Sequence, residues 1–268
     1  MKQNISAFLK SNGSLKLFLL AIVFSICSGI IALLSNALGS FLFWIDESSI
    51  QIPASEYGYT SSIFILSSLV ICVINVVFSL FMNGALFSAY RYFSGKTDKR
   101  TGLKTFTELT LADIIILIIE VVILCVLLIG YLPVSKDIAS GTSIAAIRSI
   151  LVISVLIASP LFIGALVLQI INYKGIKKWV GCAYAADENK ILGKPSTFVY
   201  VYAIITAVIC AICLLAVIPR LFNSGYTYSL IFNVGRFLSL GFSLASTVIY
   251  IILMKRFKQV LLLLRKRK

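Results

Sequence analysis

Six long apolar stretches run through this chain, and they constrain its fold more than any other feature of the sequence. Each is long enough to form a helix across the roughly 30 Å hydrocarbon core of a bilayer, which takes about 20 residues. Because lipid offers the backbone no hydrogen-bond partners, we expect these stretches to be helical even where Ile and Val are frequent. The predicted spans are residues 17–43, 61–88, 111–132, 147–171, 197–218 and 230–254.

The composition agrees with lipid as the main solvent of the chain. Of its 268 residues, 60% are hydrophobic and 13% are charged, whereas a soluble domain is about half apolar and about a quarter charged. The first apolar run, Leu17 to Leu34, is longer than the apolar region of a signal peptide, which has roughly 7–15 residues. We therefore predict an all-α polytopic membrane protein with a single six-helix domain over residues 1–268 and an uncleaved first span.

The distribution of Lys and Arg predicts the orientation of this bundle. If the N-terminus lies in the cytosol, four cytosolic segments contain 20 of the 24 basic residues. Because basic residues accumulate on the cytosolic side, we expect both termini there, with a basic tail over residues 255–268. The net charge of +14 then reflects orientation and contact with anionic lipid head groups, and not nucleic-acid binding. The cytosolic segments are residues 1–16, 89–110, 172–196 and 255–268.

One cytosolic segment, residues 174–190, has the pattern of a short amphipathic helix. It mixes Lys177 and Lys178 with apolar residues that include Trp179. Such a helix can lie flat on the membrane surface. A permease would have to expose a coupling element to a partner ATPase, and residues 174–194 are the candidate. We therefore take Lys177, Lys178 and Trp179 as a candidate interfacial or coupling segment.

The sequence lacks the residues that most enzymes and metal sites require. It contains no histidine, which removes the commonest general base and zinc ligand. Five of the six cysteines fall in apolar stretches, among them Cys210 and Cys213, and such surroundings disfavour a reactive thiolate. The GKT at residues 95–97 lacks the upstream glycine of a phosphate-binding loop, because Tyr90 occupies that position. We therefore expect no catalytic residues, no metal and no cofactor.

The sharpest candidate site is a set of polar residues inside the predicted membrane. Asn75, Ser79 and Asn83 are spaced four apart and share one face of their helix. Glu120 lies roughly 13 Å inside the next span, where a charge costs about 2.5–3.5 kcal/mol. We expect Glu120 to approach Ser79 or Asn83 and to hold the two helices together. Glu120 either binds a proton, a cation or the positive group of a substrate, or is protonated and only hydrogen-bonds the neighbouring helix.

Small residues predict where helices approach one another closely. Ala21, Ser25 and Gly29 form a ridge on the first span, and Gly241 and Ala245 form one on the last. Such ridges let helix backbones pack at short distance. We therefore expect both of these helices to make tight helix–helix contacts.

Several segments give the chain the layout of a known group of proteins. The tripeptide FLK at residues 8–10 precedes the first span, and the last span ends in LASTVIYIILMKRFK. The basic loops RYFSGKTDKRTGLKTF and AYAADENKILGKPSTF precede the third and fifth spans. This layout resembles the YciC-like and related families of uncharacterised bacterial multi-pass membrane proteins. The resemblance implies a bacterial plasma (inner) membrane location and transfers no functional residues.

Two functions agree with these features. The first is a non-enzymatic accessory or scaffold protein, in envelope homeostasis or in protection against a membrane-active peptide. The second is the permease subunit of a transporter that is paired with a separate ATPase. An intramembrane enzyme that uses Glu120 ranks behind both, because the sequence offers no second catalytic group. The expected partners are anionic lipids and a membrane protein or an ATPase.

Overall fold

Six α-helices make up the part of the chain that the computed structural model describes, which is residues 13–49, 57–96, 101–138, 144–187, 195–222 and 227–266. These described residues contain no β-strand, so the prediction of an all-α protein is confirmed. The helices are α2 (Ser14–Ser49), α3 (Tyr57–Phe93), α4 (Thr101–Ile138), α5 (Ile144–Asp187), α6 (Phe198–Phe222) and α7 (Thr227–Lys266).

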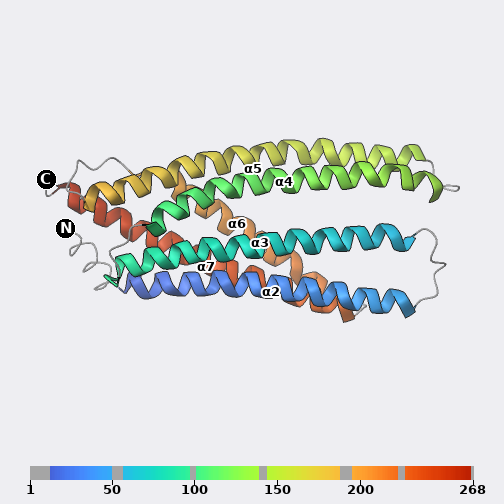
Figure 1. Cartoon of the computed structure of the whole chain (residues 1–268), viewed down its shortest axis with the longest axis horizontal. Helices are drawn as coiled ribbons and strands as arrows, with labels where there is room; N and C mark the ends of the chain where they lie inside the picture. The colour runs from blue at the N-terminus through green and yellow to red at the C-terminus, as the bar shows by residue number, and fades with distance from the viewer. Residues whose placement is uncertain are drawn as a thin grey trace.

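The helices lie side by side along one long axis, and each runs antiparallel to the one before it (Figure 1). Consecutive helices are in contact, and α2 and α7 share the most extensive interface. As a result, α2 begins at the end of the bundle where α7 ends (Figure 1). We call this the terminal end. The helices α3 and α5 also end there, and α4 and α6 begin there.

Four helices are long and apolar enough to cross a membrane, which indicates a membrane protein. Large apolar side chains on their surfaces remain exposed, such as Phe81 at 63% and Leu215 at 64%, as expected where lipid replaces water. The other two predicted spans fall within α4 and α5, where the side chains of residues 124–159 lie outside the described part. The four segments that are long and apolar enough to cross a membrane are Ser14–Gly39, Leu69–Phe93, Phe198–Phe222 and Ser229–Val260.

The end of α5 differs from the sequence prediction. Residues 174–187 continue α5 as one uninterrupted helix, and the prediction of a separate amphipathic helix on the membrane surface is wrong for this part. The reason is that Trp179 packs into the bundle, with its ring stacked on Phe257 of α7. Residues 188–190 of the predicted segment lie outside the described residues.

Small residues bring α2 and α7 together. Ala21 is fully buried, and its carbonyl accepts a 2.9 Å hydrogen bond from the hydroxyl of Ser246. Farther along, the hydroxyl of Ser28 donates to the Ser239 carbonyl at 2.9 Å, and the hydroxyl of Ser239 donates to the Ser28 carbonyl at 3.0 Å. These reciprocal bonds require the close approach that small side chains allow. The predicted ridge on the first span is therefore confirmed at Ala21.

The glycine that matters at this interface is Gly235. A Cβ atom placed on Gly235 would lie 2.0 Å from the Cβ of Ser35, which no real pair of carbons tolerates. Gly241, which the sequence singled out, has open space where its Cβ would be. Gly29 faces α3 instead, with Val76 and Ser79 at ordinary contact distance from such a Cβ. The ridge on α2 thus serves both neighbouring helices.

Candidate ligand-binding cavity

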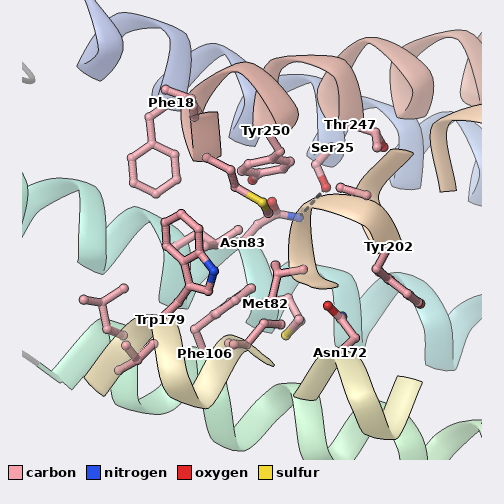
Figure 2. A pocket seen from close by; sticks show the side chains of 18 of the residues that line it. Phe18, Ser25, Met82, Asn83, Phe106, Asn172, Trp179, Tyr202, Thr247 and Tyr250 are labelled. Atoms are coloured by element: carbon pink, nitrogen blue, oxygen red, sulfur yellow. Dashed lines mark hydrogen bonds between the residues drawn. The ribbon is translucent and has the colours of Figure 1, made fainter. Parts of the chain in front are cut away.

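A cavity of about 630 Å³ lies between all six helices, in the part of the bundle near the terminal end (Figure 2). Sites for small molecules are typically clefts of roughly 300–1,000 Å³ with a mostly apolar lining and a few placed polar groups. The cavity fits that description. Its lining residues fall within positions 14–25 of α2, 75–93 of α3, 103–113 of α4, 172–180 of α5, 199–206 of α6 and 247–257 of α7.

Aromatic side chains line the cavity toward the terminal end. The ring of Trp179 stacks on that of Phe257 with centroids 5.7 Å apart, and Phe93 meets Phe257 edge-on at 6.0 Å. The indole N–H of Trp179 donates a 2.7 Å hydrogen bond to the carbonyl of Ser196, just before α6. These contacts join α3, α5, α6 and α7, so the aromatic cluster fixes this end of the cavity.

Polar side chains line the deeper end. Asn75 lies 18 residues, roughly 27 Å, from Phe93 along α3, and Asp113 lies 12 residues, roughly 18 Å, into α4. Figure 2 accordingly shows Phe18 and Trp179 on one side of the cavity and polar groups on the other. The cavity is thus amphipathic along its length. The polar residues at this end are Ser25, Asn75, Ser79, Asn83, Asp113, Asn172, Tyr202, Thr206, Thr247 and Tyr250.

Three polar atoms of the lining are buried without a hydrogen-bond partner. They are Oδ1 of Asn83, Oδ1 of Asn172 and the hydroxyl oxygen of Tyr250. Asn83 is only 3% exposed, although its amide nitrogen is satisfied by the hydroxyl of Ser25 at 3.0 Å and the carbonyl of Ser79 at 2.8 Å. Leaving such an atom unpaired costs about 1–3 kcal/mol, and these three atoms are buried in the packing behind the cavity surface.

Glu120 pairs with a different residue from the one that the sequence predicted. The side-chain nitrogen of Asn75 donates a 2.6 Å hydrogen bond to Oε1 of Glu120, which joins α3 to α4. The predicted packing of these two helices is therefore confirmed. The predicted partners of Glu120 were Ser79 and Asn83, one and two turns away from Asn75, and on this point the prediction was wrong.

The polar row on α3 divides between two neighbours, which explains that difference. Asn83 turns toward α2, where it bonds Ser25, while Asn75 reaches α4. Ser79 lies between them, and its hydroxyl accepts a 3.3 Å bond from Asn83. A spacing of four residues drifts around a helix of 3.6 residues per turn, so the two ends of the row face different helices.

The three residues of the predicted cytosolic segment have separate roles. Trp179 lines the cavity, whereas Lys177 and Lys178 are exposed on the outside of α5 near the terminal end. They therefore do not form one surface with the tryptophan. The exposed pair remains a candidate contact for head groups or for a partner.

The carboxylate of the cavity is Asp113 and not Glu120, which is absent from the lining. Asp113 is close enough to Glu120 and to Tyr202 to interact electrostatically with both. The side chain of Gln169 on α5 lies beside Tyr202 on α6. In the sequence, Asp113 shares a helix face with Glu120 but sits near the edge of its predicted span, where an acid attracts little notice.

Asn172, Tyr202 and Tyr250 are three further lining residues that the sequence did not single out. Each lies near the end of a predicted span, where polar and aromatic residues are common for reasons of membrane anchoring alone. Their distance along each helix from the cytosolic end of the predicted span is the signal that could have identified them. Each lies within three turns of the level of the aromatic cluster on its own helix, so the three face one another across the bundle.

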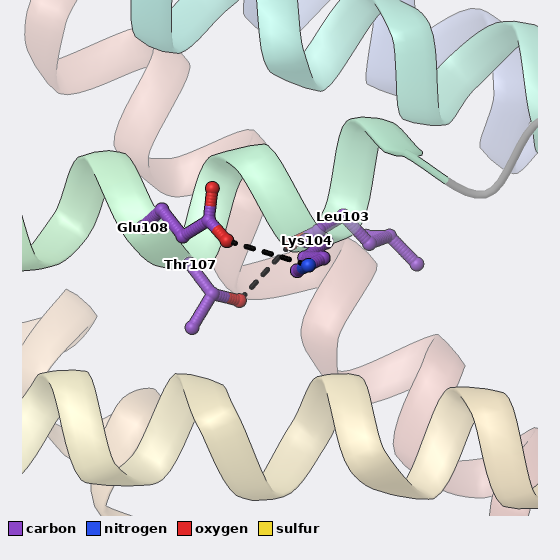
Figure 3. Close-up of polar contacts among 4 residues, drawn as sticks. All are labelled: Leu103, Lys104, Thr107 and Glu108. Carbon is purple, nitrogen blue, oxygen red and sulfur yellow. Dashed lines mark hydrogen bonds and ion pairs between the residues drawn. The ribbon is translucent and has the colours of Figure 1, made fainter.

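The first turns of α4 carry charges that do not belong to the cavity. Nζ of Lys104 and Oε1 of Glu108 form an ion pair at 3.8 Å, and these side chains are 77% and 65% exposed (Figure 3). Such an exposed pair contributes about 0.3–0.5 kcal/mol. The hydroxyl of Thr107 bonds back to the carbonyl of Leu103 at 3.0 Å. This solvated pattern agrees with a span that begins later, near residue 111.

Metal chemistry has no obvious site in the described part of the chain. No group of three or more Cys, Asp or Glu side chains lies close enough there to hold an ion. Cys210 instead lies 3.9 Å from the hydroxyl of Ser243, at the contact of α6 with α7.

Comparisons of the chain with protein families, with characterised proteins and with solved structures give no match. The resemblance to the YciC-like families therefore stays a prediction.

Proposed function

We propose that this chain is a non-enzymatic membrane protein with six spans that binds a hydrophobic small molecule in its central cavity. The observation that carries the proposal is the cavity itself, lined by residues of all six helices, mostly apolar at one end and polar at the other. A protein that served only as a scaffold would gain nothing from a space of this size between its helices. The accessory roles in envelope homeostasis or peptide protection would act through this bound molecule.

The orientation of the bundle is part of the proposal. In the up-and-down arrangement, α2 begins and α3, α5 and α7 end at the terminal end, and the basic segments adjoin these helix ends in the sequence. The bias in Lys and Arg supports the cytosol on that side. The cavity would then open toward the cytosolic half of a bacterial plasma membrane.

A permease subunit paired with a separate ATPase is the second candidate, and one observation favours it. The helix α5 continues well past its predicted span, to Asp187, and exposes Lys177 and Lys178 there. A rigid extension of a cavity-lining helix would couple a partner's movement to the cavity. Copurification of an ATPase with the full chain would support this role, and purification of the chain without one would favour the accessory role.

Fluorescence of Trp179 can test the binding proposal directly. The chain has two tryptophans, so the variant Trp44→Phe leaves Trp179 in the cavity as the only emitter. We expect 1-bromonaphthalene, a neutral heavy-atom quencher, to quench Trp179 in lipid nanodiscs with a saturable dependence on concentration. Binding to a finite site saturates, whereas partition into lipid does not.

The matched control moves the tryptophan to an exposed apolar position. The control protein combines Trp44→Phe, Trp179→Phe and Phe81→Trp. Its only tryptophan then lies on α3, at a position where the native side chain is 63% exposed. We expect its quenching to rise linearly with the concentration of the quencher. Equal, linear quenching at both positions would overturn the proposed function.

A further inference from the structure

We propose that the ligand of the cavity is a lipophilic organic cation whose charge lies next to Asp113, an inference that rests on the proposed function. The lining contains this one carboxylate and, among the described residues, neither Lys nor Arg. An uncompensated acid at the edge of an apolar cavity attracts positive charge more strongly than it would in water, because the local dielectric constant is lower. The same acid repels an anionic head group.

The aromatic residues favour a cation with a large apolar part. Rings attract organic cations through the negative potential of their faces, by about 0.5–1 kcal/mol at exposed sites and about 2 kcal/mol where water is excluded. The stacked pair Trp179–Phe257 and the rings of Tyr202 and Tyr250 lie along the cavity. They would enclose the apolar part of the ligand, with its charge toward the polar end.

The polarity gradient decides against the opposite arrangement, in which an anionic lipid places its head group at the basic terminal end. That orientation would set the acyl chain among Asn75, Ser79 and Asp113 and the charged head beside Phe93 and Trp179. The basic side chains of the terminal end also do not offset the charge of Asp113, because Asp113 lies roughly 18 Å along α4 from Thr101 and exposed charges are screened beyond a Debye length of about 8 Å in physiological salt.

Two ions of nearly equal size and opposite charge test the inference. We expect tetraphenylphosphonium to bind the protein in nanodiscs of neutral lipid at least about tenfold more tightly than tetraphenylborate, each measured by equilibrium dialysis against empty nanodiscs. A tenfold ratio corresponds to about 1.4 kcal/mol, which is modest for one ion contact in a site of low dielectric constant. Tetraphenylborate binding as tightly as the cation would overturn the inference.

Variants assign the preference to one side chain. Asp113→Asn should weaken tetraphenylphosphonium binding about tenfold, and a cooperative thermal unfolding transition like that of the unaltered protein shows that the variant is folded. Glu120→Gln, the neighbouring acid outside the lining, should have a smaller effect. An unchanged cation affinity in a folded Asp113→Asn protein would overturn the inference. If Asp113→Asn does not fold, the relative affinities of the unaltered protein for tetraphenylphosphonium and tetraphenylborate still test the inference.

The two proposals fail in different ways. Saturable quenching of Trp179 without a preference for the cation would leave a cavity that binds neutral or anionic molecules, and only the charge assignment would fall. Linear quenching, together with no binding of either ion above empty nanodiscs, would remove both proposals.

Discussion

The side-chain nitrogen of Asn75 on α3 donates a 2.6 Å hydrogen bond to Oε1 of Glu120 on α4. Through this bond Glu120, which is not part of the cavity lining, has a partner on the adjacent helix in Asn75, which is. Of the two roles that the sequence left open for Glu120, the contact favours the structural one. The acid whose position suits a ligand is Asp113, two turns closer to the terminal end.

A double-mutant cycle measures what the Asn75–Glu120 bond contributes. We expect Asn75→Ala and Glu120→Ala each to lower the free energy of unfolding, with a coupling of about 0.6–1.7 kcal/mol, the range found for hydrogen bonds between membrane helices. Glu120→Gln should lose little, because its amide oxygen still accepts the bond. The measurement is reversible unfolding in mixed micelles. Strictly additive effects of the two alanines would show that the bond does not hold the helices together.

The contact of Gly235 with Ser35 predicts a strong effect from one methyl group. Gly235→Ala should destabilise the protein by about 1–3 kcal/mol, because its Cβ would overlap the Cβ of Ser35. Gly241→Ala, on the same helix but with open space at its Cβ, should be neutral or stabilising by up to about 1 kcal/mol. Thermal unfolding in detergent compares the two variants.

A second-site change checks that the clash is the cause. Adding Ser35→Gly to Gly235→Ala removes the opposing Cβ and should restore part of the lost stability. If Gly235→Ala and Gly241→Ala unfold at the same temperature, α2 and α7 are not packed as closely as described.

Cys182 should react slowly with thiol reagents at neutral pH. It is 6% exposed, packs with Leu15 and Val260 near the terminal end, and burial raises the pKa of its thiol. The thiolate is the reactive form, so a higher pKa means less of it at a given pH. In a variant that keeps Cys182 as its single cysteine, the maleimide rate should still rise about tenfold per pH unit above pH 8, near the ordinary thiol pKa of about 8.5.

The matched control for Cys182 carries its single cysteine at exposed position 177, as Lys177→Cys. Its rate should be higher throughout and should level off near the ordinary thiol pKa of about 8.5. A Cys182 rate that levels off at or below the pH where the control does would contradict a raised pKa.

The sequence predicts the helices of this protein well because one local property, continuous hydrophobicity, determines them. The spans at 17–43, 61–88, 197–218 and 230–254 coincide with apolar helices of the described structure. Their ends are predicted poorly. The helix α5 continues past the end of its predicted span, where Trp179 packs on Phe257. That neighbour is 78 residues away in the chain, so no local pattern contains it.

The cavity is harder to predict, since it depends on the rotation of each helix about its axis. The spacing of Asn75, Ser79 and Asn83 correctly identifies a polar face but not the helix that each residue meets. Asp113 and Glu120 lie on the same helix, two turns apart, but only Asp113 lines the cavity. Likewise, Gly235 and Gly241 look equivalent in sequence, and only the position of Ser35 on α2 distinguishes them.

Labelling from one side of the membrane tests the proposed six spans and their orientation. In a cysteine-free background, Phe222→Cys, at the end of α6 away from the terminal end and 84% exposed, should react with a membrane-impermeant maleimide added to intact cells. Lys177→Cys should react only after the cells are opened, because the basic terminal end is expected in the cytosol. The opposite pattern would mean that the bundle is inverted.

Ser140→Cys decides whether α4 and α5 cross the membrane. This residue lies in the sequence between the two helices, which are the ones whose central side chains are not described. If both helices span, position 140 is on the outside and its cysteine should react in intact cells, like that at position 222. If the two helices do not cross, position 140 stays on the side of position 177 and reacts only in opened cells. A four-span bundle would leave the cavity without two of its six walls inside the bilayer, so this single variant also bears on the site.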